Sequence, residues 1–386
     1  MTFYAQHGYG KADKLNVLAG NGAIAGVILS PADEETDGLR RATGAMARHG
    51  VETVLDPQTY VYTIPNAVGR CHENLHLDFG PLSWASLTPA HIQAQVEAVL
   101  EANARVGTTG PVIAPAPRQT SLNDLWLPLA LQYARTMADR AGGSKVLASV
   151  VLEEGGLGDW DAIERWLDVA TTLDVLGFYI IIGRRSAYPS AWDRGPLSNL
   201  LRLVYRLQVL NEYRVILGYT DFTGVAATAM GASAVASGWN YRQRQFLSER
   251  WIPQSGGQAP VPRVTSEALL SPLYAQGEME SAARSALGAQ ILGDPGLRQR
   301  IAFQAASWRN AEAVLQHLEA LGGCVREVEA AGDPSTRLDH LVQATAHASR
   351  LFDDLRRQGA RIEAVHPTAA ASLAAAVADA RRAEGI

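Results

Sequence analysis

The chain has 386 residues, a formal net charge of −5 and two cysteines. Its 47% hydrophobic and 19% charged residues are typical of a soluble, enzyme-like protein. The net negative charge excludes a surface that attracts polyanions as a whole, so contact with nucleic acid would require a local basic patch. The length suits one large barrel with an appended region, or two ordinary domains.

The two cysteines, Cys71 and Cys324, are too few for a cysteine-rich zinc site. They pair if the compartment is oxidising, but we expect two unlinked thiols in a reducing cytosol. The N-terminus lacks a basic segment followed by an apolar one, and no apolar run reaches the ~18–20 residues needed to cross a bilayer. The sequence therefore predicts a cytoplasmic protein without membrane contact.

Short apolar runs alternate with helical patterns over the first two-thirds of the chain. The runs are apolar on both faces, as expected of parallel strands that are covered on both sides. The predicted strands are residues 2–7, 25–30, 52–56, 111–116, 145–153, 175–182, 214–219 and 233–237. The helices predicted between them are residues 13–18, 35–49, 90–106, 122–141, 159–173, 197–212 and 225–229.

This alternation predicts an α/β fold, a (β/α)8 TIM-type barrel over residues 1–265, with the working surface at the C-terminal ends of the strands. A doubly wound open sheet has the same local pattern and is the alternative. Long insertions are expected after strands 3 and 8, at residues 60–85 and 239–263. Residues 266–386 are rich in Ala, Arg and Glu and are predicted to form a helical C-terminal region that packs on the barrel.

The residues that follow the strands should converge on one mouth, even when they are far apart in sequence. His7 and Asp221 are candidates for an acid–base pair. Asp56 with Glu153 or Glu154 could form a carboxylate pair of the kind used on glycosidic bonds. Each of these candidate residues also has a purely structural interpretation. Acidic residues at strand ends often cap the next helix, and a buried His often forms a hydrogen bond with a neighbouring carboxylate.

A cationic and aromatic segment follows the last predicted strand, where Arg242, Arg244 and Arg250 alternate with Trp239 and other aromatic residues. Arginines beside aromatic rings suit phosphates and stacked bases, and Arg185 would extend this patch. The alternative is a solvated helix with an apolar packing face.

A further histidine pair, His72 and His76 with Asp78 nearby, has a spacing that metal sites use, but no third ligand is placed beside it. We therefore predict neither a metal nor a cofactor.

Four segments resemble the tRNA-guanine transglycosylase superfamily, whose members are barrels that exchange a purine-like base in a nucleic acid. The resemblance runs from about residue 20 to about residue 295. The segments are residues 150–156 with the strand 175–183, residues 54–58, residues 231–244 and residues 266–279. The resemblance implies that Asp56 recognises the base and that Glu154 occupies the place of a base-contacting glutamine.

The chain also departs from this family. Strand four ends in Pro115-Ala116-Pro117 without the aspartate that reads the purine edge, and the nucleophile position falls on Ala236 or Ser237. The family's zinc motif is missing. Transfer chemistry with the family's own aspartate is therefore in doubt, and Asp221 or Glu153 would have to replace it.

Three hypotheses follow. In the first, a diverged transglycosylase-like barrel binds or modifies a nucleobase or a nucleic acid, tRNA or DNA. The residues that would bind the base or substrate are Asp56, Gln58, Glu154, Tyr9 and Trp239. The phosphates would be bound by Arg185, Arg242 and Arg244. The carboxylate for the chemistry would be Asp221 or Glu153. In the second, a metal-independent barrel enzyme acts on a small molecule through His7 and a carboxylate. In the third, the barrel is a non-catalytic subunit, and its C-terminal helices bind a second copy or another protein.

Overall fold

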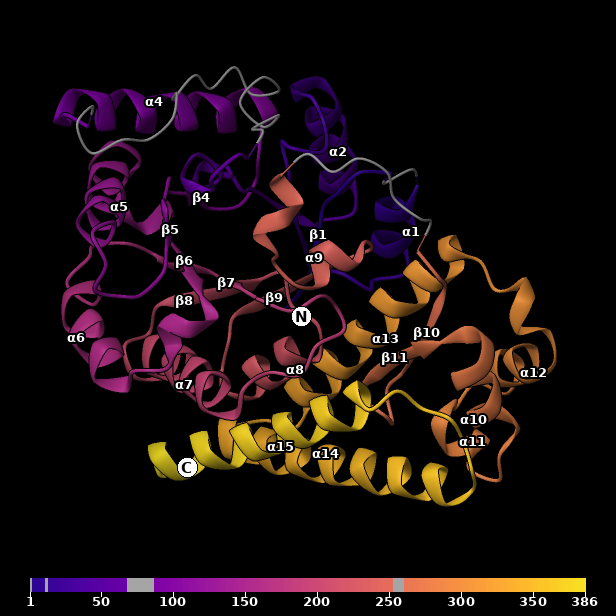
Figure 1. The fold of residues 1–386 in the computed structure, drawn as a ribbon. Coiled ribbons are helices and arrows are strands. Elements are labelled where there is room, and N and C mark those ends of the chain that lie inside the picture. Colours follow the sequence, from indigo (N-terminus) through magenta and orange to yellow (C-terminus); the bar gives the residue numbers. More distant parts are fainter. Residues whose placement is uncertain (1, 11–12, 68–86, 253–259) are drawn as a thin grey trace.

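The computed structural model describes residues 2–10, 13–67, 87–252 and 260–386. Strands and helices alternate as far as β9, and the rest of the chain is mostly helical (Figure 1). None of the helices in these residues is long and apolar enough to cross a membrane.

All eight predicted strands are present, and a short ninth strand, β5, follows β4. They are β1 (Phe3–Gln6), β2 (Gly26–Leu29), β3 (Glu52–Leu55), β4 (Val112–Ile113), β5 (Arg118–Gln119), β6 (Val146–Glu153), β7 (Gly177–Gly183), β8 (Arg214–Gly218) and β9 (Ala234–Gly238). Every residue of β7 is buried, as the absence of a polar alternation in its sequence predicts.

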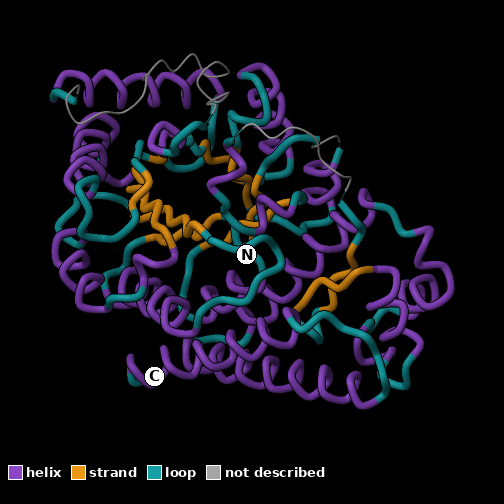
Figure 2. Tube along the Cα trace, viewed as in Figure 1, coloured by secondary structure: helices purple, strands orange, loops and turns teal. Residues whose placement is uncertain are grey.

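The strands form one parallel sheet in the order β3-β2-β1-β9-β8-β7-β6-β4, with β5 paired to β6. The sheet curls into a half-barrel with helices outside it (Figure 2). Glu52 on β3 and Arg214 on β8 are far apart in the strand order, yet their side chains form an ion pair, with Arg214 Nη1 3.2 Å from Glu52 Oε1. The predicted eight-strand α/β architecture is confirmed, whereas no ladder pairs β3 with β4 among the described residues, so the closed barrel stays a prediction.

The helices between the strands also follow the prediction, with boundaries shifted by a few residues. They are α1 (Lys14–Gly20), α2 (Thr36–Arg48), α4 (Pro89–Val106), α5 (Leu127–Ala141), α6 (Trp160–Ala170), α7 (Arg194–Tyr205) and α8 (Phe222–Ala229). Helix α4 illustrates the local signals: Thr88 accepts a hydrogen bond from His91 N, Pro89 begins the helix, and Gly107 ends it with φ +76°.

The C-terminal region begins with a β-hairpin, which the sequence analysis did not predict. Strand β10 (Arg263–Ser266) pairs antiparallel with β11 (Ser271–Tyr274), so the expectation that the chain is helical from residue 266 onward is wrong at its start, and the expected boundary at residue 265 falls inside β10. The helices that follow are α10 (Glu280–Arg284), α11 (Gly288–Ile291), α12 (Pro295–Gln304), α13 (Asn310–Ala330), α14 (Pro334–Arg357) and α15 (Val365–Glu384).

The last three helices pack on the outside of the half-barrel. Helix α13 contacts α8 and β1, α14 contacts α8, and α15 lies along α7 (Figure 1). The contact between α15 and α7 is also ionic, because Glu384 is buried between Arg202 and Arg206, with Oε1 2.8 Å from Arg202 Nε. These contacts hold the C-terminal helices against the outside of the half-barrel.

Candidate functional site

The C-terminal ends of the strands carry three groups of polar side chains. The first surrounds Asp56 after β3, the second joins Glu153 to Arg118 between β6 and β5, and the third lies around Asp221 and Arg184 after β8 and β7. All three are at the end of the sheet where parallel barrels place their working surface.

Asp56 is buried, and both of its carboxylate oxygens accept hydrogen bonds. Oδ1 accepts a hydrogen bond from Gln58 N at 3.0 Å, and Oδ2 accepts from Tyr60 Oη at 3.0 Å and from Tyr179 Oη at 3.2 Å. Burial raises the pKa of Asp56 to about 6, although these hydrogen bonds and the positive charge of Arg250 act in the opposite direction. A carboxyl group with this pKa exchanges protons near neutral pH.

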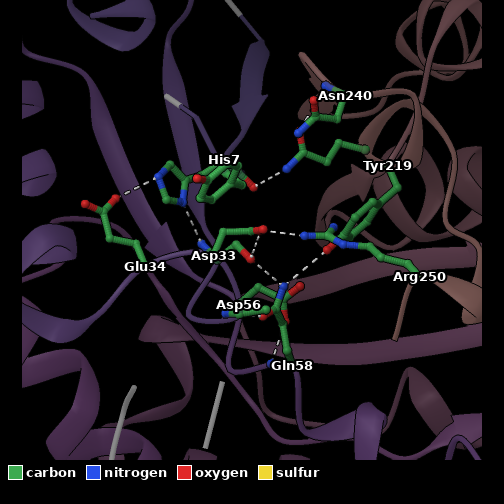
Figure 3. Close-up of polar contacts among 12 residues, drawn as sticks. His7, Asp33, Glu34, Asp56, Gln58, Tyr219, Asn240 and Arg250 are labelled. Atoms are coloured by element: carbon green, nitrogen blue, oxygen red, sulfur yellow. Dashed lines mark hydrogen bonds and ion pairs between the residues drawn. The ribbon is translucent and has the colours of Figure 1, made fainter. Parts of the chain in front are cut away.

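Gln58 connects Asp56 to the neighbouring strands. Its Nε2 donates to Ser30 Oγ at 2.9 Å and to Tyr219 Oη at 3.3 Å, as Figure 3 shows in part. Gln58 and Tyr219 both have φ +55°, in the left-handed region that costs a non-glycine residue about 1–3 kcal/mol. Sequence analysis expected Asp56 and Gln58 to act together, and the structure places them in direct contact.

His7 is also buried but does not pair with Asp221. Its Nδ1 accepts from Ser30 N at 3.3 Å, and its Nε2 lies 3.2 Å from Glu34 Oε2 (Figure 3). The proposed His7–Asp221 acid–base pair is therefore not formed, and the carboxylate partner of His7 is Glu34.

The segment of residues 245–252 covers the Asp56 group. Phe246 and Trp251 pack edge-on against Tyr60, with ring centroids 5.4 and 6.1 Å away. Arg250 forms an ion pair with Asp33 (Figure 3). The mouth above Asp56 is thus closed by side chains from the segment after β9, and Arg250 contributes to this cover.

Glu153 and Glu154 form ion pairs with two different arginines. Glu153 Oε1 is 2.6 Å from Arg118 Nη1, whereas Glu154 Oε1 is 3.3 Å from Arg184 Nη1. Neither glutamate contacts Asp56, so the carboxylate pair expected from the sequence is not assembled.

A pocket lies between the ends of β7 and β8. Its polar lining includes Asp221, Arg184 and Arg244, and Trp192 forms an aromatic wall. The guanidinium of Arg184 lies 3.7 Å from the centre of the Trp192 ring. A second pocket shares Ser190, Trp192, Asp221 and Thr223 with the first and extends towards α15, so Asp221 lies where the two pockets meet.

Asp221 has both a structural and an electrostatic role. It caps α8, because its Oδ1 accepts from Thr223 N at 3.1 Å. Burial raises its pKa, and the nearby charge of Arg184 partly opposes this effect. Burial in turn lowers the pKa of Arg184. Within the described residues, the buried Nε of Arg184 has no hydrogen-bond partner.

The three arginines expected to bind phosphate do not form one patch. Arg185 and Arg242 are exposed, but Arg244 is buried, donates to Gly238 O at 3.1 Å and lies 5.1 Å from the centre of the Tyr241 ring. Arg244 lines the pocket beside Asp221 and is not part of a surface patch.

Tyr9 and Trp239 are linked through the backbone. Trp239 is buried, and its Nε1 donates to Tyr9 O at 2.8 Å, while the Tyr9 side chain is 78% exposed. Neither residue lines the Asp221 cavity. His72, His76 and Asp78, together with Cys71, lie outside the described residues.

Several residues of the site were not predicted. Tyr179 lies within β7 rather than at its end, although its two-residue spacing from Ile181, which also faces the interior, was a usable signal. The contributions of Trp192 and Glu34 depend on loop conformations, and that of Arg118 on the two-residue strand β5, none of which a local pattern specifies.

Fold and site together define an α/β protein with a curled parallel sheet, a polar mouth and a cavity beside the mouth. None of the known protein-family models matches the chain, and no curated protein is detectably similar to it in sequence.

Proposed function

We propose that this chain is a diverged transglycosylase-like barrel that binds a polar molecule of nucleobase size in the cavity beside Asp221. The observation that carries the proposal is a pocket in which a half-buried carboxylate and two buried guanidinium groups share one lining.

The lining suits a molecule that both donates and accepts hydrogen bonds. The edge of a nucleobase presents N–H donors beside carbonyl acceptors. Asp221 would accept from a ring or amino N–H, while Arg184, through its unpartnered Nε, would donate to a carbonyl oxygen. Trp192 would provide an apolar surface for the ring.

The Asp221→Asn substitution tests this proposal cleanly. Asparagine caps a helix as well as aspartate does, so α8 should keep its cap while the negative charge is lost. We expect a free base from a panel of purines and pyrimidines to bind the parent protein in calorimetry. Its affinity should fall about 10- to 100-fold in Asp221→Asn, the cost of one hydrogen bond to a charged group. An exposed control, Asp161→Asn, should bind as the parent does. Absence of binding, or equal binding in Asp221→Asn, would exclude the proposal.

A second candidate is acid–base chemistry on a small molecule, with Asp56 in place of the His7–Asp221 pair. The observation in its favour is the raised pKa of Asp56, about 6, together with a chain of hydroxyls. Tyr60 Oη lies 3.0 Å from Asp56 Oδ2 and 3.4 Å from Tyr219 Oη, and Tyr219 lines the cavity. Turnover governed by a group with a pKa near 6 and abolished in Asp56→Asn would support it; a rate independent of pH between about 5 and 7 would exclude it.

We further propose that the half-barrel closes into a complete (β/α)8 barrel between β3 and β4. Thr109 N and Gly110 N donate to Thr53 O at 3.2 and 2.9 Å, and the Thr53 and Thr109 hydroxyls are 3.2 Å apart. These contacts join the two edge strands just before β4 begins.

We also propose that the protein contacts tRNA or DNA, and that its C-terminal helices bind a second copy or another protein. The exposed Arg185 and Arg242 are the residues that would contact phosphate. The double substitution Arg185→Gln with Arg242→Gln should weaken tRNA or DNA retention and leave base binding unchanged; unchanged retention would exclude this role. A mass that increases with concentration would support self-association through the helices.

A further inference from the structure

A cluster outside the mouth brings three metal-binding side chains together in the C-terminal region. Glu278 follows β11, Glu363 precedes α15, and His366 is in the first turn of α15. One potential ligand atom from each lies within 4.8 Å of the others. None of the mouth residues belongs to this cluster, and the proposed base binding does not depend on it.

His366 is oriented towards the two carboxylates by a serine. Its Nδ1 lies 2.7 Å from Ser271 Oγ on β11, and its Nε2 faces Glu278 Oε2 at 3.7 Å. The imidazole is 1% exposed, and within the described residues its Nε2 has no hydrogen-bond partner. A buried nitrogen without a partner is costly, because it has lost its hydrogen bonds to water.

The position of Glu278 is also fixed. Its Oε2 accepts from Tyr274 N at 2.8 Å, and its Oε1 accepts from Glu363 N at 2.7 Å. A carboxylate has about four lone-pair sites, so both oxygens retain capacity for a further ligand.

We propose that Glu278, Glu363 and His366 bind a divalent transition-metal ion of the zinc or manganese type. Two carboxylates neutralise its charge, and one imidazole supplies the nitrogen donor that such ions favour. Ligands around tetrahedral zinc lie about 3.4 Å apart, from bond lengths of 2.0–2.2 Å. The observed 3.7 Å between His366 Nε2 and Glu278 Oε2 needs only a small adjustment, and the ligand atoms of the three residues, all within 4.8 Å of one another, must approach by at most about 1.4 Å.

The hydrogen bond between His366 and Ser271 fits this assignment. A histidine that binds a metal through Nε2 usually donates its Nδ1–H to an oxygen, and Ser271 Oγ is placed to accept it. Glu363 is exposed, so the ion reaches the site from solvent. The bound ion would join the turn that follows β11 to the start of α15, which makes its role structural.

The test uses the full chain, stripped with a chelator and titrated with Zn²⁺ or Mn²⁺ in calorimetry. We expect one tightly bound ion per chain for at least one of these metals, and a rise in the thermal unfolding midpoint on binding. Glu363→Gln should weaken binding at least about tenfold and remove the rise in the midpoint. The substitution is at an exposed position and keeps the backbone N–H that Glu278 uses, so the fold should be retained.

Glu164→Gln, an exposed glutamate on α6, is the matched control and should bind the ion as the parent does. The proposal is overturned if the parent binds neither metal stoichiometrically. It is also overturned if Glu363→Gln binds as tightly as Glu164→Gln, because the ion would then be held by other side chains.

Discussion

Asp56 should make the stability of this protein depend on pH in a direction opposite to that of most aspartates. Burial raises its pKa from 3.8 to about 6, so between these values the folded protein holds a proton that the unfolded chain has released. The contribution to the free energy of unfolding is therefore greatest below about pH 4 and declines as pH rises through about 6. At 1.36 kcal/mol per pKa unit, the loss amounts to about 3 kcal/mol.

The Asp56→Asn variant cannot titrate at this position, so it isolates the effect. Urea unfolding followed by tryptophan fluorescence would be measured for both proteins from about pH 4 to about pH 7. The stability of the parent relative to Asp56→Asn should fall by about 3 kcal/mol over this range. Asp161→Asn, which is exposed, should show no such trend. A parent-to-variant difference that is constant with pH would refute the reasoning that burial dominates the Asp56 environment.

Three further changes test the cover, the backbone and the free thiol. Phe246→Ala should lower the free energy of unfolding by about 3–5 kcal/mol in urea titrations, because Phe246 is fully buried against Tyr60 and Tyr219; a loss below 1 kcal/mol would contradict its role in the cover. Glu212→Gly should stabilise the protein by about 1 kcal/mol, seen as a higher unfolding midpoint, since Glu212 is exposed and has φ +59°; a lower midpoint would count against backbone strain there. Cys324 should resist iodoacetamide until the protein is denatured, because burial raises the pKa of its thiol, and peptide mapping would reveal early labelling if this is wrong.

The sheet could be predicted from the sequence because its strands are buried on both faces. Such strands are continuous apolar runs, and β7, with seven buried residues, is the clearest example. The hairpin β10–β11 gave no such signal. Its strands have four residues each, and they include Arg263, Ser266 and Pro272, whose burial comes from the helices around them. Helical composition in the surrounding sequence therefore concealed it.

The site was predictable only as far as strand ends determine it. Asp56 and Gln58 follow the same strand two residues apart, so their contact follows from local geometry. His7 and Asp221 are also at strand ends, but β9 separates β1 from β8, and Glu34 from the neighbouring β2 loop reaches His7 first. The burial of Arg244 depends on the short helix α9 (Tyr241–Arg244), which turns its guanidinium back onto the carbonyl of Gly238. Such side-chain directions are tertiary properties and have no local signal.

The central claim, that the cavity beside Asp221 binds a molecule of nucleobase size, is tested most directly by calorimetry with free bases. The proposal predicts that at least one base binds the parent and Asp161→Asn equally, and binds Asp221→Asn about 10- to 100-fold more weakly. Equal affinity in all three proteins, or no binding to the parent, would contradict it.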